Sequence, residues 1–115
     1  MGAVVMPRGK GGSSVTTGKA SVALDNRTPT FDIPLTGTPS AVLVWIDSQQ
    51  TWPVVLTQDC NSRTLMNVSD TLILGMAVAS LDSAASRLTI SRWQFDRPDY
   101  TLRDYSGTVY YVALG

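Results

Sequence analysis

Short runs of alternating apolar and polar residues, separated by turn residues, recur along most of this sequence. A period of two places successive side chains on opposite faces of a β-strand, whereas a helix needs apolar residues three or four apart. Residues that favour exposed helix positions are scarce, because the chain has no Glu and its only lysines are Lys10 and Lys19. Thr, Val and Ser are abundant instead and suit strands and polar turns. The sequence therefore predicts an all-β fold.

Turn residues such as Asp25-Asn26 and the segment 37–40 bound each alternating run. About eight short strands at a spacing near ten residues are typical of an antiparallel β-sandwich or jelly roll, which is the architecture we predict. The expected strands are residues 20–24, 31–35, 41–46, 52–56, 64–68, 71–81, 88–95 and 108–114.

Four features of these runs carry further expectations. Pro34 marks an edge strand or a bulge, because proline has no backbone N–H to donate. Residues 41–46 are apolar at both alternate positions and predict a central strand covered on both faces. Residues 108–114 share this pattern, which places them in mid-sheet or against another subunit. The apolar parity of residues 88–95 slips midway and predicts a β-bulge near residues 91–92.

Residues 71–81 are the one segment that could form a helix instead of a strand. Asp70 is a possible N-cap, and Leu72 and Met76 have loosely helical spacing. Gly75 in the middle of the segment disfavours a helix, so we expect a strand.

Residues 1–19 are rich in glycine and polar residues and cannot bury enough apolar area to fold alone. We therefore expect a flexible N-terminal arm, residues 1–19, followed by one sandwich domain, residues 20–115. The arm is either a disordered tail or an assembly arm that becomes ordered on a neighbouring subunit. Residues 4–6 and Val15 favour the assembly arm, because they give it apolar surface to bury.

The titratable residues exclude most enzyme classes. Without histidine the chain lacks Ser-His-Asp and Cys-His nucleophiles, histidine metal sites and the usual proton carrier at neutral pH. A single cysteine, Cys60, forms neither an intrachain disulfide nor a Cys-rich zinc site. The acids of residues 96–104 alternate with arginines, which favours local ion pairs over catalysis or calcium binding. We expect no enzymatic activity, no catalytic or metal-binding residues and no cofactor.

Nine basic and nine acidic side chains give the chain a net charge of zero. A balanced chain without a basic stripe lacks the electrostatic signature of a protein that binds nucleic acid or anionic lipid. The longest apolar stretch, residues 72–79, is too short to cross a bilayer, and residues 1–6 are too short for the apolar region of a signal peptide. We expect no nucleic-acid partner, no membrane insertion and no signal peptide.

Aromatic side chains are concentrated in the last quarter of the chain and are the best candidates for contact residues. Tryptophan and tyrosine stack on sugars and occupy the centres of protein interfaces. We expect Phe31, Trp45 and Phe95 in the core, with one residue of the pair 110–111. The candidate ligand or partner contacts are Trp52, Trp93, Tyr100 and Tyr105.

Three stretches of sequence resemble small β-sandwich modules of tailed-bacteriophage virions, such as tail-fibre tips and H-type-lectin-like domains. They are FDIPLTGTPSAVLVW at residues 31–45, LTIS at 88–91 and the terminal YYVALG at 110–115. The resemblance covers residues 20–115. It implies a virion component made in the host cytoplasm, with capsid decoration or host attachment as its role. No sugar-contacting residue of those modules can be matched here, and the chain lacks the long shaft of a complete fibre.

A decoration, adaptor or short-fibre subunit is therefore the function we expect, and a carbohydrate-binding lectin-like module is the alternative. The two-sided apolar strand 108–114 and the small size favour a homo-oligomer, preferably a trimer. Its further partners would be other virion proteins and a host surface glycan.

Overall fold

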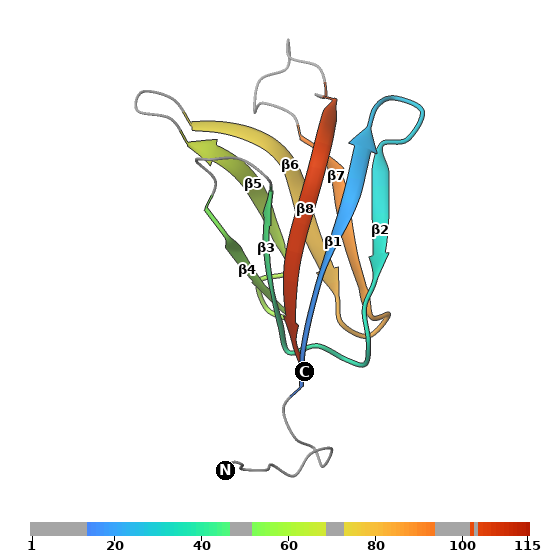
Figure 1. Cartoon of the computed structure of the whole chain (residues 1–115), viewed down its shortest axis with the longest axis vertical. Helices are drawn as coiled ribbons and strands as arrows, with labels where there is room; N and C mark the ends of the chain where they lie inside the picture. Colours follow the sequence, from blue (N-terminus) through green and yellow to red (C-terminus); the bar gives the residue numbers. More distant parts are fainter. Residues whose placement is uncertain (1–13, 47–51, 69–72, 94–101, 103) are drawn as a thin grey trace.

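The computed structural model describes residues 14–46, 52–68, 73–93, 102 and 104–115. Within these residues eight strands form two four-stranded antiparallel sheets (Figure 1). The strands are β1 (Val15–Leu24), β2 (Thr30–Pro34), β3 (Ala41–Ile46), β4 (Val54–Thr57), β5 (Ser62–Val68), β6 (Ile73–Asp82), β7 (Arg87–Arg92) and β8 (Tyr105–Leu114). Sheet A has the order β1-β8-β3-β4, and sheet B has the order β2-β7-β6-β5. This two-sheet sandwich confirms the predicted fold class.

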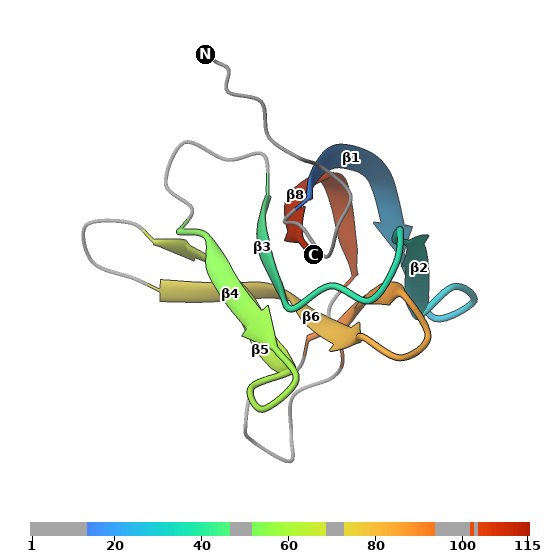
Figure 2. The ribbon, with the colours of Figure 1, turned by 90° about the horizontal axis from the view of Figure 1, so that it is seen from below.

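The two sheets pack against each other, and their edge strands meet at both sides of the sandwich. Strands β1 and β2 lie side by side at one edge of the sandwich (Figures 1 and 2), and β4 contacts β5 at the other. Alternate residues of each strand point inward and exclude water, which is the main stabilising term for such a fold. The buried core consists of Val22, Leu24, Ile33, Val42, Val44, Ile46, Val54, Leu56, Leu65, Ala77, Ala79, Leu81, Leu88, Ile90, Tyr105, Val109 and Ala113.

Several sequence-based expectations are confirmed. Strand β3 has the predicted bounds, and Pro34 lies in the edge strand β2. The segment that could have been a helix is strand β6, and β8 lies in mid-sheet between β1 and β3. The described residues contain no helix that is long and apolar enough to cross a membrane.

The boundary predicted at residue 19 is wrong, because β1 already begins at Val15. Residues 15–19 pair with β8, and Gly18 lies opposite Tyr111. A Cβ atom at Gly18 would overlap the Tyr111 ring, so glycine is required here for packing rather than for flexibility. Residues 1–13, the rest of the predicted arm, lie outside the described residues.

The bulge predicted near residues 91–92 is also wrong. The pairing of β7 with β6 runs without a shift to Arg92, which lies opposite Ala77. Arg92 therefore lies at an inward position of β7, and its guanidinium Nη2 pairs with Asp104 Oδ1 at 2.9 Å. A charged residue at the end of the strand, rather than a bulge, interrupts the apolar pattern. The register does shift in β5, between Leu65 and Met66.

Two tight turns follow the side-chain chemistry expected of them. Asp25 Oδ1 accepts hydrogen bonds from the backbone N–H groups of Thr28 at 2.8 Å and Arg27 at 2.9 Å. These bonds, with Thr28 first, lower the pKa of Asp25. In the β6–β7 turn, Ser86 has a φ of 52° and donates its hydroxyl to the Gly37 carbonyl.

Candidate functional site

The four predicted contact residues do not form one site. Trp52 is 61% exposed and lies just before β4 at the edge of sheet A, whereas Trp93 is half-buried and follows β7 of sheet B. Tyr100 lies outside the described residues. Tyr105 is only 7% exposed and belongs to the core, so its predicted role as a surface contact is wrong. The reason is that β8 begins at Tyr105, whereas the sequence suggested a loop there.

The core also differs from the aromatic core that the sequence predicts. Phe31 and Tyr111 are partly buried and pack against it, as expected. Trp45 is half-buried and lies at an outward position of β3, because Val44 and Ile46 take the inward positions. Phe95 lies outside the described residues.

Four of the described acidic residues form hydrogen bonds or ion pairs within the fold, namely Asp25, Asp32, Asp82 and Asp104. Asp104 pairs with Arg92, whose guanidinium also donates to the Leu102 carbonyl at 3.0 Å. The Arg92 side chain is 11% exposed and that of Asp104 is 66% exposed, so the guanidinium is largely buried while the carboxylate faces water. Among the described residues, no group of three or more His, Cys, Asp or Glu side chains could hold a metal ion.

The outer face of sheet A is the most unusual surface of the molecule, because its two central strands carry apolar residues at outward positions as well. Only the inward face of β3 is covered by the sandwich, which corrects the prediction of a strand covered on both sides. We call the part of the outer face where β1, β8, β3 and β4 lie side by side the sheet A face. It consists of Val15, Thr17 and Lys19 of β1, Tyr110, Val112 and Leu114 of β8, Ala41, Leu43 and Trp45 of β3, and Val55 and Thr57 of β4. The outward residues further along β1 and β8, which are Ser21, Ala23, Ser106 and Thr108, are not part of it.

The strand register arranges these side chains in rows across the sheet. Leu43 lies opposite Val112 on one side and Val55 on the other. Trp45 lies opposite Tyr110, so the two rings stack with centroids 5.8 Å apart and planes 13° from parallel. The only charged residue of the sheet A face is Lys19, on the edge strand β1.

A shallow hollow of about 440 Å³ lies beside this aromatic pair. The surface of its lining is mostly apolar, although Thr17, Lys19, Trp45 and the two tyrosines carry polar side-chain groups. The residues around it are Thr17, Gly18, Lys19, Trp45, Tyr110, Tyr111 and Val112.

The described outward residues of sheet B, by contrast, include several polar side chains that are paired with one another, beside the apolar Val78. Thr89 Oγ1 donates to Asp32 Oδ1 at 2.8 Å, and an ion pair joins β6 to β7 at the turn. Ser80 Oγ donates to the hydroxyl of Ser62 on the neighbouring strand at 3.3 Å. These groups also suit contact with water.

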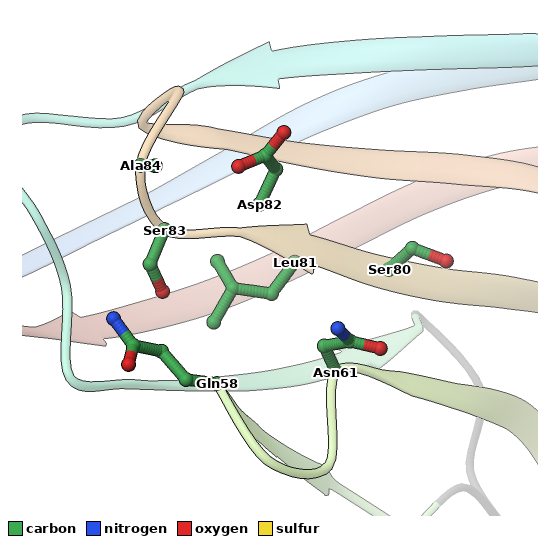
Figure 3. Close-up of a pocket in the computed structure, with 7 residues that line it drawn as sticks. All are labelled: Gln58, Asn61, Ser80, Leu81, Asp82, Ser83 and Ala84. Carbon is green, nitrogen blue, oxygen red and sulfur yellow. The ribbon is translucent and has the colours of Figure 1, made fainter.

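A second hollow, of about 420 Å³, lies where the β4–β5 and β6–β7 turns meet (Figure 3). Its polar groups mainly hold the turns together. The backbone N–H of Leu81 donates to the Asn61 carbonyl at 2.7 Å, and the buried Ser83 hydroxyl donates to the Pro39 carbonyl at 3.0 Å. Figure 3 shows the Asp82 carboxylate pointing away from Gln58 and Asn61. The acid and the amides therefore do not converge on one ligand position.

Sequence reasoning did not identify the sheet A face, although its signal was visible. Residues 41–46 and 108–114 are apolar at both alternate positions. This pattern predicts a strand covered on both faces for the first segment and a place in mid-sheet or against another subunit for the second. The missing information was that these two strands are neighbours and expose their outward residues together. Comparisons with protein-family models, curated proteins and solved structures find no match to this chain.

Proposed function

We propose that this chain is a structural subunit that acts through protein–protein contact, with the sheet A face as its contact surface. The observation that carries the proposal is the continuity of the apolar rows across β8 and β3, with one charged residue at their margin. Four strands about 4.8 Å apart and five residues of about 3.4 Å give this surface a projected area of roughly 300 Å². An apolar patch of about 300–600 Å² is the largest that a typical monomer exposes and is often functional.

The resemblance to phage virion modules supports a virion as the assembly in which this contact is made. In this proposal the chain is a decoration, adaptor or short-fibre subunit of a bacteriophage virion, assembled with its own copies and with other virion proteins. A small sandwich is suited to that task, because its core holds a broad flat sheet in a fixed shape. Affinity then depends on side chains of the sheet A face that are already in position before contact.

The stacked pair of Trp45 and Tyr110 favours a second candidate, the carbohydrate-binding module. A flat aromatic surface beside polar groups is the arrangement on which sugars stack. Specific sugar binding also needs several convergent hydrogen-bonding groups, and the surface that lines the hollow beside this pair is mainly apolar. Protein contact is therefore the better supported function.

Density-gradient fractionation of a lysate in which the chain is made from its native genome tests the proposal. We expect the chain to sediment with virion particles. We also expect Leu43→Lys, which places a charge in the middle of the sheet A face, to release it from them. Val78→Lys is the matched control, because Val78 is also half-buried, on a central strand of sheet B, and lies outside the sheet A face.

Two results would contradict the proposal. One is wild-type chain that remains in the soluble fractions at the top of the gradient. The other is glycan-array binding that Trp45→Ala abolishes, without any association with particles, which would favour the carbohydrate-binding module.

A further inference from the structure

We infer that the sheet A face is covered by the same face of another copy of this chain. The inference rests on the proposed protein-contact function and names the partner. It starts from the central strands β8 and β3, whose outward side chains stand in two adjacent apolar columns. Sheets that pack face to face in proteins interdigitate such columns at a separation of about 10 Å.

The charge distribution selects a copy of the chain over a foreign charged partner. Lys19 is the one charged residue of the sheet A face, and no acidic residue belongs to the face. When copies meet around an axis along the strands, β8 and β3 lie at the centre and Lys19 stays at the rim, where its ammonium group reaches water. The net charge of the chain is zero, so approaching copies do not repel each other over long range.

The hollow beside Trp45 and Tyr110 provides a place for side chains of the second copy. An aliphatic side chain from its central strands, such as Leu43, would enter a space lined by three aromatic residues. Aromatic residues near the centre of an interface that excludes water contribute most of the binding energy in typical complexes.

The available area sets the expected strength. Stable complexes bury about 800 Å² on each partner, whereas the projected area of the sheet A face is roughly 300 Å². Trp52, which precedes β4 and is 61% exposed, adds apolar surface beyond the sheet A face. We therefore expect a reversible complex that forms at micromolar concentrations and dissociates on dilution.

Sedimentation equilibrium across the micromolar range tests this inference with the purified full chain. The wild type should show a mass that rises with concentration to two or three times 12.4 kDa. Leu43→Lys should remain at 12.4 kDa at every concentration, whereas Val78→Lys should behave like the wild type. Circular dichroism melts of all variants confirm that each chain is folded.

Val55→Lys provides a second test in case Leu43→Lys does not fold. Val55 lies on the edge strand β4 and is 47% exposed, so a charge there disturbs the sheet A face with little effect on the core. It should raise the dissociation constant at least tenfold. A wild type that stays at 12.4 kDa overturns the inference, as does self-association that both Leu43→Lys and Val55→Lys leave unchanged.

The particle experiment separates this failure from failure of the proposed function. If the wild type is monomeric but sediments with particles, and Leu43→Lys does not, another protein covers the sheet A face. The inference is then wrong, while the proposed role of the sheet A face in contact with other virion proteins stands. If the wild type neither self-associates nor sediments with particles, both are wrong.

Discussion

The two sheets are built with the same alternation but present opposite outer faces. The outward residues of the central strands in sheet B include Ser80 and Thr89, which are paired to polar side chains of β5 and β2. The corresponding strands of sheet A present Leu43 and Val112, opposite each other. Inward residues thus determine the sandwich, and outward residues determine which face contacts water and which can contact protein.

This contrast has a consequence for stability. Covering a polar outer face with a partner lowers the free energy little. Covering an apolar outer face lowers it more, because apolar surface that the single chain exposes is removed from water. The difference between the faces should therefore appear in association and not in the folding of the single chain.

The largest expected effect is on the free energy of unfolding when core side chains are shortened, and it should be similar for both sheets. Leu56→Ala in sheet A and Leu88→Ala in sheet B each remove a side chain that is completely buried. Each should lower the free energy of unfolding by about 2–5 kcal/mol. Urea denaturation of both variants measures this, and a loss confined to one sheet would show that the core is not shared.

A smaller effect is expected where β1 joins sheet A. Gly18→Ala places a methyl group against the Tyr111 ring and should lower the free energy of unfolding by about 1–3 kcal/mol. Removing the ring in the double variant Gly18→Ala, Tyr111→Ala should make the added methyl cost less than it does alone. Unchanged stability in Gly18→Ala would mean that residues 15–19 do not pack as described.

Apolar substitutions on the outer face of sheet B should make that face self-associate, as we expect of the sheet A face. Ser80→Val and Thr89→Val together replace two outward polar side chains of the central strands with apolar ones. Folding stability should change by less than about 1 kcal/mol, because exposed hydrogen bonds contribute little and valine suits strands. In a Leu43→Lys background, sedimentation should show renewed self-association, and a purely monomeric variant would contradict the role given to outward residues.

The smallest effect is expected at the exposed Asp25 turn, which belongs to neither face. The backbone N–H groups of Thr28 and Arg27 lower the pKa of Asp25 below its ordinary 3.8. The charged carboxylate therefore stabilises the folded state above pH 3.8, and this contribution is lost as the pH falls through the lowered pKa. Asp25→Ala should melt slightly below the wild type at neutral pH and equally in strong acid. A difference that grows in acid would contradict this assignment.

The fold was largely predictable from the sequence, because the period of two and the turn residues act locally. Residues 41–46 and Pro34 show this: their strand positions follow from a few neighbouring residues. The start of β1 was not predictable, because Gly18 is explained only by Tyr111 on a strand far along the chain. A local pattern cannot tell a flexible glycine from one that makes room for a ring.

The candidate site was less predictable than the fold. Both apolar strands were visible in the sequence, but the register that sets Trp45 against Tyr110 depends on a pairing between distant segments. The prediction that Tyr105 is a surface contact was wrong for a related reason, because the burial of this side chain depends on where β8 begins. Surface contacts thus follow from long-range pairing, which one sequence alone does not determine.

The pairing of β1 with β8 also sets how the domain responds to mechanical force. Val15 lies opposite Leu114, and the backbone N–H of Gly115 donates to the Ser14 carbonyl at 2.9 Å. The start of β1 and the end of β8 therefore lie together at the same end of the sandwich (Figure 1). A pulling force applied between these two ends opens the antiparallel ladder one residue pair at a time, instead of shearing all ten residues of β1 together. The domain should therefore yield at low force along that path.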